Sequence, residues 1–329
     1  MPEAPAVLGG ILEAAVPRVC SAAVAVIAVA GTTVAAAAVG ETVRYATVSE
    51  ELADDRPPAR RDSIFDLASI TKLFTTAVIL SLVDEGRLDL DEPVATWLPA
   101  CYAGAPEVTL RHLLTHTAGL PPGRRAHEEI PGDGSEIHAS RMELILSTRA
   151  LHPVGGRYLY SDVGLITAGR VAEIAGKASL DALLHARVTG PLGLPDTGYR
   201  PAASLRPRIV ATEDKPERLG SGCVRGEVHD ETAYGLGGVA GHAGVFSTAD
   251  DLVRFTEVLR TGGAPILSPE AVAEMTRDQG AEGADFRHGL GVRIGDPAIV
   301  GPLTGGYGHS GFTGTSSSSI PHALSRSSC

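Results

Sequence analysis

Ser69 and Lys72 are the two side chains in this sequence that could most directly do chemistry together. They are three residues apart at the start of a long helical pattern, so they share one helix face and can touch. A serine hydroxyl becomes nucleophilic when a neighbour takes its proton, and a lysine can do so when burial and nearby positive potential lower its pKa. No other Ser-x-x-Lys spacing occurs in the chain. The alternative interpretation is that Ser69 caps the helix and Lys72 is a solvated cation.

Two further stretches could add polar groups to such a site. Tyr160 follows a Gly-Gly turn and precedes Ser161-Asp162 at a predicted helix start, where its hydroxyl could carry a proton or polarise a substrate. Alternatively, Ser161 or Asp162 caps the helix and Tyr160 packs. His309-Ser310-Gly311 follows a glycine-rich run, and small residues at a strand edge would let a substrate approach with His309 as donor. An isolated histidine is more often an ordinary surface residue whose hydrogen bonds are satisfied.

Histidines and carboxylates also gather where a metal ion could bind. His229-Asp230-Glu231 and His242 lie in a glycine-rich loop without helical His-x-x-x-His spacing. His112 and His116 have that spacing on a predicted helix, but a leucine replaces the glutamate of a metalloprotease, so we expect them to pack. The four cysteines show no C-x-x-C pairing. The sequence therefore predicts no metal ion and no cofactor.

The elements that must position these residues are predicted from hydrophobic spacing and turn signals. A helix over 4–16 precedes a hairpin with strands 22–30 and 34–39, and the Ser-x-x-Lys helix covers 71–85. Strands return only near 244–247, 290–294 and after 308. Further helices are predicted over 109–115, 141–147, 161–175, 179–188 and 249–260 and from 269 onwards.

Strands at both ends with helices between them predict an α/β (α+β) fold. We expect one antiparallel sheet built from both termini and flanked by helices, with a mostly helical domain inserted. Residues 1–66 and 225–329 would form the sheet-containing domain, and residues 67–224 the helical domain that carries the Ser-x-x-Lys helix. The site would lie between them.

The composition limits the classes of partner. The chain has 329 residues and a formal net charge of -11, which disfavours binding to nucleic acid and to anionic lipid. Its uncharged stretch near the N-terminus is interrupted by Gly31-Thr32-Thr33, so no membrane span is expected. The first residues lack the basic start of a secretory signal, and we expect a cytoplasmic protein that acts on a small molecule. The oligomeric state is not predicted.

Together, the motifs resemble the serine hydrolase family of class C β-lactamases, D-alanyl-D-alanine carboxypeptidases (penicillin-binding proteins) and related esterases. The stretches that carry the resemblance are FDLASITK at 65–72, LLTHTAGLP at 113–121 and GGVAGHAGVFS at 237–247. The resemblance extends over about residues 5–315. It implies a β-lactamase/transpeptidase-like fold, an ester, amide or β-lactam substrate and no cofactor, and members of this family are often exported.

The resemblance also implies catalytic roles. Ser69 would be the acylated nucleophile, with Lys72 as its general base or proton relay. Tyr160 would exchange protons with the nucleophile and the leaving group. The backbone N–H groups of Ser69 and Phe312 would form the oxyanion hole.

Two substrate-binding positions depart from the family pattern. Asp162 occupies the usual Asn place and offers an acceptor instead of an amide donor, and His309 occupies the usual Lys place and is mostly neutral at pH 7. With Ser310, Gly311 and Phe312 they would line the substrate site. Both departures favour an esterase or peptidase-like enzyme. The alternatives are a β-lactamase or carboxypeptidase proper, acyl transfer to an acceptor other than water, or a catalytically impaired ligand-binding homologue.

The tail departs from the family most. Members of the family continue after the strand of the His309-Ser310-Gly311 motif through two hydrophobic strands and a terminal helix. Here that motif is followed by Ser316-Ser317-Ser318-Ser319 and the chain ends at Cys329. We expect the last strands and helix to be lacking, by truncation or frameshift. An unpaired edge would then remain on the segment that carries His309. Low stability, poor solubility and a mobile oxyanion hole would follow unless a partner chain fills the gap.

Overall fold

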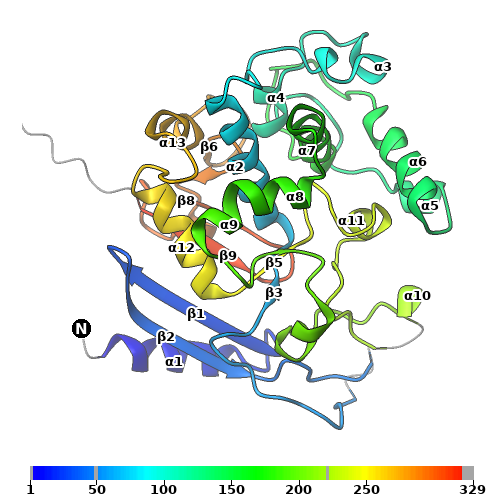
Figure 1. Ribbon diagram of the computed structural model, residues 1–329. Coiled ribbons are helices and arrows are strands. Elements are labelled where there is room, and N and C mark those ends of the chain that lie inside the picture. The colour runs from blue at the N-terminus through cyan, green and yellow to red at the C-terminus, as the bar shows by residue number, and fades with distance from the viewer. Residues whose placement is uncertain (1–2, 48–50, 220–221, 321–329) are drawn as a thin grey trace, which may run out of the picture.

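The computed structural model describes residues 3–47, 51–219 and 222–320. The chain begins with helix α1 (Ala4–Ala15) and a hairpin of β1 (Ala22–Val29) and β2 (Thr32–Gly40), which pair antiparallel with Ala22 opposite Gly40. Ala30 and Gly31 at the hairpin turn both have positive φ, as the tightest hairpin turns require. Helix α1 packs along β2, so these elements form a layer of their own (Figure 1).

Helix α2 (Thr71–Asp84) is the central element of the remaining chain. All of its residues from 71 to 82 are buried, and apart from Lys72 they are apolar or small on every side of the helix. It packs against α7 (Asp162–Gly176), α8 (Leu180–Leu184) and α13 (Pro269–Thr276). The other helices and helical turns are η1 (Ala68–Ile70), η2 (Val94–Thr96), α3 (Pro99–Tyr102), α4 (Leu110–Leu114), α5 (Ala126–Glu129), α6 (Ser135–Leu146), η3 (His185–Thr189), α9 (Gly190–Leu192), η4 (Ala203–Arg208), α10 (Pro216–Leu219), α11 (Glu231–Gly235), α12 (Ala249–Arg260) and α14 (Pro297–Val300).

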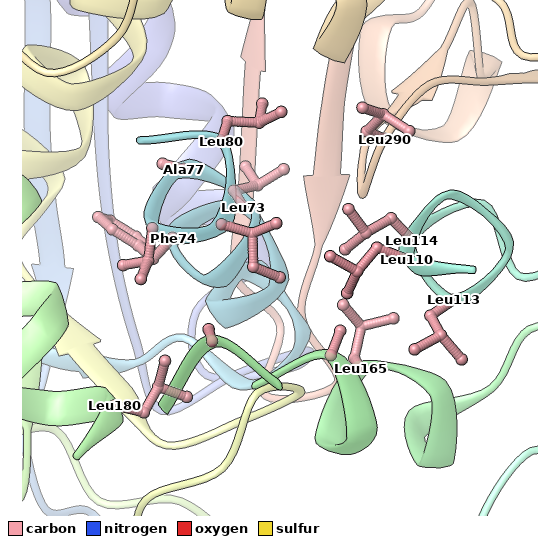
Figure 2. Close-up of a cluster of buried hydrophobic side chains, with 14 of the residues drawn as sticks. Leu73, Phe74, Ala77, Leu80, Leu110, Leu113, Leu114, Leu165, Leu180 and Leu290 are labelled. Carbon is pink, nitrogen blue, oxygen red and sulfur yellow. The ribbon is translucent and has the colours of Figure 1, made fainter. Parts of the chain in front are cut away.

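The hydrophobic core fills the space around α2. Leucines of α4, Leu165 of α7 and Leu180 of α8 converge on it (Figure 2). On another side of α2, the ring of Phe74 stacks on Phe255 of α12 with centroids 4.1 Å apart. This packing fixes the direction of α2 and therefore of the residues at its first turn.

The remaining strands form two small sheets. β3 (Phe65–Asp66), β5 (Val245–Ser247) and β4 (Gly198–Tyr199) pair in the order β3-β5-β4. The second sheet has the antiparallel order β6-β7-β8-β9, formed by β6 (Arg287–His288), β7 (Arg293–Ile294), β8 (Tyr307–Ser310) and β9 (Ser316–Ser319).

The α/β fold class is confirmed, but the strands of the two termini do not join into one sheet within the described residues. The hairpin pairs only with itself, and it meets the C-terminal sheet through α12, which contacts both β1 and β9. The predicted unpaired edge beside His309 is wrong, because β9 pairs with β8 and places Ser317 opposite His309. Four serines can form this strand because the hydrogen bonds between paired strands join backbone groups and need no particular side chain. The rest of the tail prediction falls on 321–329, outside the described residues.

No helix in the described part of the chain combines the length and the apolar character that crossing a membrane requires.

Candidate active site

Ser69 lies where β3 turns into α2, in the single helical turn η1. Its Oγ accepts hydrogen bonds from Lys72 Nζ at 2.8 Å and from Tyr160 Oη at 2.9 Å. Lys72 is fully buried one turn further along. The structure thus brings together three side chains that the sequence separates by up to 91 residues.

The charge state of Lys72 differs from the sequence-based expectation of a depressed pKa. Burial would lower the pKa of Lys72, but the Asp162 carboxylate, whose Oδ1 lies 2.8 Å from Nζ, and the Tyr160 hydroxyl outweigh it and raise the pKa. Lys72 is therefore an ammonium at neutral pH. It also donates to the carbonyl of His242 at 3.2 Å.

The Tyr160 ring packs beside buried histidine rings. The ring of His116 lies 4.6 Å from the Tyr160 ring, and its Nδ1 accepts the N–H of Ser161 at 3.0 Å. Burial keeps the pKa of His116 well below its ordinary value and lowers that of His288 to about 4, so both rings are neutral. Two positive charges lie over the Tyr160 ring: the ammonium of Lys72, 4.9 Å from the ring centroid, and the guanidinium of Arg293, 5.7 Å from it.

His309 is buried on β8, with its ring centroid 6.2 Å from that of Tyr160. Its Nδ1 lies 2.7 Å from the carbonyl of Ser310, which can only accept, so Nδ1 carries the proton. Burial and the nearby charges of Lys72 and Arg293 hold the pKa of His309 well below its ordinary value. The neutral ring thus offers a lone pair on Nε2, whereas the sequence suggested a donor.

The turn after β8 is tied to the segment that precedes Ser69. Thr313 Oγ1 donates to the carbonyl of Asp66 at 2.7 Å, and Thr315 Oγ1 donates to that of Leu67 at 3.1 Å. Gly311 approaches so closely that an added Cβ would lie 2.3 Å from the Leu67 carbonyl oxygen, so only glycine fits. These contacts place Phe312, whose side chain is 77% exposed, on a turn held against the Ser69 segment.

The two histidine pairs considered as metal ligands have other contacts. His242 Nε2 lies 2.9 Å from Asp230 Oδ1, and His229 Nδ1 lies 3.1 Å from Thr212 Oγ1. His112 belongs to the capping box of α4, whereas His116 lies beyond the helix end, so the two do not share a helix face. Within residues 3–47, 51–219 and 222–320, no three His, Cys, Asp or Glu side chains are grouped closely enough to hold a metal ion.

Sequence reasoning assigned no role in this site to three residues that contact it, of which Asp230 was considered only as a metal ligand. Asp66 was quoted only as part of a motif, yet its carboxylate supports the backbone just before Ser69. Arg293 lies over the Tyr160 ring, and Asp230 contacts the histidine whose carbonyl accepts from Lys72. For Asp66 a signal existed, since a charged residue is rare at the centre of a buried apolar run. For Arg293 no local signal existed.

Comparison with known proteins gives one family. Residues 18–321 match the model of the family described as "Beta-lactamase". A protein of Salmonella schwarzengrund (strain CVM19633) named "Putative D-alanyl-D-alanine carboxypeptidase" is 30% identical over 295 residues, which cover 80% of this chain and 68% of that protein.

Two solved structures have the same fold. The octameric penicillin-binding protein homologue from Pyrococcus abyssi superposes with a TM-score of 0.73 at 22% identity, over 97% of this chain and 71% of that one. EstCE1, described as a hydrolase with promiscuous acyltransferase activity, also gives a TM-score of 0.73, at 25% identity over 95% and 89% of the two chains.

Proposed function

This chain belongs to the beta-lactamase family of serine hydrolases, and from that premise we propose that Ser69 forms an acyl-enzyme with small esters or amides, which water then hydrolyses. The observation that carries the proposal is the position of Ser69 Oγ, within 2.8 Å of Lys72 Nζ and 2.9 Å of Tyr160 Oη. A hydroxyl that contacts two proton-carrying groups can lose its proton during attack on a carbonyl carbon.

We assign the proton transfers from these contacts. Lys72 is charged, so it can take the Ser69 proton only while it passes one of its own to Asp162, 2.8 Å away. Lys72 is thus a relay rather than a free amine base. The Tyr160 hydroxyl lies 2.9 Å from Ser69 Oγ and so beside the carbonyl carbon that Ser69 attacks, where Tyr160 would protonate the leaving oxygen as its bond to that carbon breaks. In deacylation Tyr160 would take a proton from the attacking water, and the proton held by Asp162 would return through Lys72 to Ser69 Oγ as the acid leaves.

The backbone N–H groups of Ser69 and Phe312 would stabilise the oxyanion. The threonine contacts that tie the Phe312 turn to residues 66 and 67 support this assignment, since they hold the two segments together. Each such donor is worth about 3 to 4 kcal/mol in serine proteases.

Short neutral esters are the substrate class that the site favours. Asp162 brings a carboxylate, and its side chain is 31% exposed, while the buried His309 ring is neutral. A substrate carboxylate, as in a β-lactam or a peptide C-terminus, would meet the Asp162 carboxylate, which already occupies the Lys72 ammonium, and no histidine cation. We therefore expect a higher kcat/KM for p-nitrophenyl butyrate than for nitrocefin. The reverse order would favour the β-lactamase or carboxypeptidase alternative.

Covalent labelling tests the nucleophile. A fluorophosphonate should add a single mass to the peptide that contains Ser69, and Ser69→Ala should abolish both the adduct and the ester hydrolysis. Ser147→Ala, at an exposed serine of the helical region, is the matched control and should react like the wild type. An equal adduct in Ser69→Ala would overturn the proposal. Saturable ester binding without any turnover would instead identify a catalytically impaired homologue.

A further inference from the structure

Asp66 is a buried carboxylate three residues before Ser69 that none of the steps above uses. It ends β3 and its residue surface is only 2% exposed. Its Oδ1 accepts the backbone N–H of Ala68 at 2.9 Å, and its Oδ2 accepts the backbone N–H of His229 at 2.7 Å. Both oxygens therefore act as acceptors for main-chain donors from two different segments.

The bond to Ala68 supports an unusual backbone conformation. Ala68 has φ of 45°, in the left-handed region that residues other than glycine rarely adopt. A side-chain oxygen that accepts the N–H two residues on stabilises a turn of this kind. Because Ser69 directly follows Ala68, this turn sets the direction from which Ser69 Oγ meets Lys72 and Tyr160.

Asp66 also connects the other walls of the site. Its main-chain carbonyl accepts from Thr313, on the turn that carries Phe312. The His229 segment that it holds continues to Asp230, which contacts His242, and the carbonyl of His242 accepts from Lys72. Through its carboxylate and its main-chain carbonyl, Asp66 thus contacts the segments that carry the nucleophile and the second oxyanion donor, and the segment that leads to the support of the lysine.

We propose that the Asp66 carboxylate is a positioning residue that holds the Ser69 turn in its reactive geometry, and that protonation of this carboxylate loosens the turn and switches acylation off. The proposal rests on the function proposed for Ser69. A protonated carboxyl oxygen is a weaker acceptor and carries a hydrogen of its own, so it cannot serve an N–H donor as a carboxylate oxygen does. One of the two main-chain contacts would then weaken.

The Asp66 carboxylate should become protonated at a pH at which activity can be measured. Burial raises the pKa of Asp66 to about 6, the charge of Asp230 acts in the same direction, and the His229 and Ala68 N–H donors and Arg218 act against it. His229, which stacks on Phe312, has a pKa that burial lowers from its ordinary value. Activity should therefore fall as the pH drops through about 6 while the protein stays folded.

The experiment compares pH profiles of kcat/KM for p-nitrophenyl butyrate, with circular dichroism at each pH. The wild type should show an acid limb near pH 6 with the slope of one proton. Asp66→Asn should lose this limb and, at pH 8, lose about 10- to 100-fold in kcat/KM through displacement of the nucleophile. The control is Asp251→Asn. Asp251 is another buried carboxylate with a raised pKa that accepts a backbone N–H, but it lies on α12. The Asp251→Asn variant should keep the acid limb of the pH profile.

A second variant separates positioning from general stabilisation. Ala68→Gly relieves the conformation that Asp66 supports, so it should make the acid limb shallower and should restore part of the activity when combined with Asp66→Asn. An unchanged limb in Ala68→Gly, or wild-type activity with the limb retained in Asp66→Asn, would overturn the proposal. If the wild type itself shows no fluorophosphonate adduct on Ser69, the proposed function fails instead, and the two failures are thereby distinguished.

Discussion

At the scale of single residues, the contact between Lys72 and Asp162 has the largest chemical consequence. The Asp162 carboxylate raises the pKa of the buried lysine, a contribution that a neutral amide at position 162 would not make. The two side chains are then a coupled unit. Substitution of either one should change how the other behaves.

Asp162→Asn should change the pH dependence of the reaction. The Asp162 charge raises the pKa of Lys72, so its removal leaves burial, which lowers that pKa. We expect kcat/KM of the wild type not to rise between about pH 7 and 9, and that of the variant to gain a rising limb there. The kcat/KM ratio of nitrocefin to p-nitrophenyl butyrate should also increase. A variant profile that matches the wild type would show that Asp162 does not control Lys72.

Lys72→Ala should abolish the proton relay. Loss of a group that moves a proton in the transition state typically lowers the rate by about 10²- to 10⁴-fold, and here the ammonium that faces Ser69 is lost as well. The measurement is kcat/KM for p-nitrophenyl butyrate. Lys177→Ala removes an exposed lysine at the end of α7 and should behave as the wild type. Full activity of Lys72→Ala would refute the assigned role.

At the scale of elements, the loop that includes Gly241 is packed between α2 and α7. A Cβ at Gly241 would lie 2.0 Å from the carbonyl oxygen of Leu165, and the Gly241 carbonyl accepts from Thr75 at 2.8 Å. The next residue, His242, supplies the carbonyl that accepts from Lys72. The distance between α2 and α7 therefore also sets where the His242 carbonyl meets Lys72.

Gly241→Ala should push this loop away from α7. Forcing an extra methyl into a packed interior typically costs about 1 to 3 kcal/mol, so Tm should fall, and kcat should fall with it because His242 moves from Lys72. Gly104→Ala is the control, since a Cβ there meets no atom within 4 Å. If Gly241→Ala kept wild-type Tm and kcat, the close approach would not matter.

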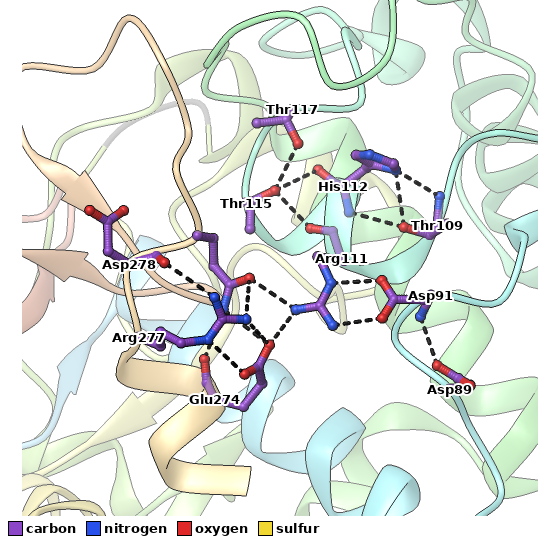
Figure 3. A network of polar contacts seen from close by, with 11 residues as sticks. Asp89, Asp91, Thr109, Arg111, His112, Thr115, Thr117, Glu274, Arg277 and Asp278 are labelled. Atoms are coloured by element: carbon purple, nitrogen blue, oxygen red, sulfur yellow. Dashed lines mark hydrogen bonds and ion pairs between the residues drawn. The ribbon is translucent and has the colours of Figure 1, made fainter. Parts of the chain in front are cut away.

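A second link between elements is the guanidinium of Arg111 on α4. It donates two hydrogen bonds of 2.7 Å to the Asp91 carboxylate. It also donates to Glu274 of α13 and to Gln279 (Figure 3). Hydrogen bonds from Arg277 and Arg111 hold the pKa of Glu274 down at about 2. The network joins the loop between α2 and η2 to α4 and α13.

Arg111→Met should loosen this link without touching the chemistry. Hydrogen bonds to charged groups contribute about 1.5 to 3 kcal/mol each when buried and less when exposed, and this side chain is 26% exposed. We expect thermal unfolding to shift down by several degrees while the activity per folded molecule stays unchanged. Arg111→Lys should recover little, because one ammonium cannot replace the planar fork. A Tm equal to that of the wild type would argue against a structural role.

At the scale of the whole molecule, one hydrophobic cluster runs through most of the fold. It includes Leu67, the core face of α2, leucines of α4 and α7 and, from the C-terminal sheet, Ile294 and Tyr307. We propose that residues 1–66 with 225–329 and residues 67–224 form two architectural domains with the site between them. Because they share this cluster, we do not expect them to fold independently.

Unfolding should therefore show a single main transition. Near-ultraviolet circular dichroism and residual esterase activity should be lost together on heating, since the active site and the core depend on the same packing. Two well-separated transitions would contradict a shared core. The low stability expected from the tail stays a prediction, and the same measurement tests it, with an ordinary Tm as the contrary result.

The sequence by itself determined the local elements, the motif residues and, through resemblance, the family. The helix over 71–85, the hairpin and the helix caps depend on residue spacing and on neighbours in the chain, which is why they could be predicted. The tertiary structure decided the rest. The charge of Lys72 depends on Asp162, 90 positions away, and the support of the Ser69 turn depends on a carboxylate that also holds residue 229. Burial and charge at a site are set by whichever segments pack there, and no local spacing encodes them.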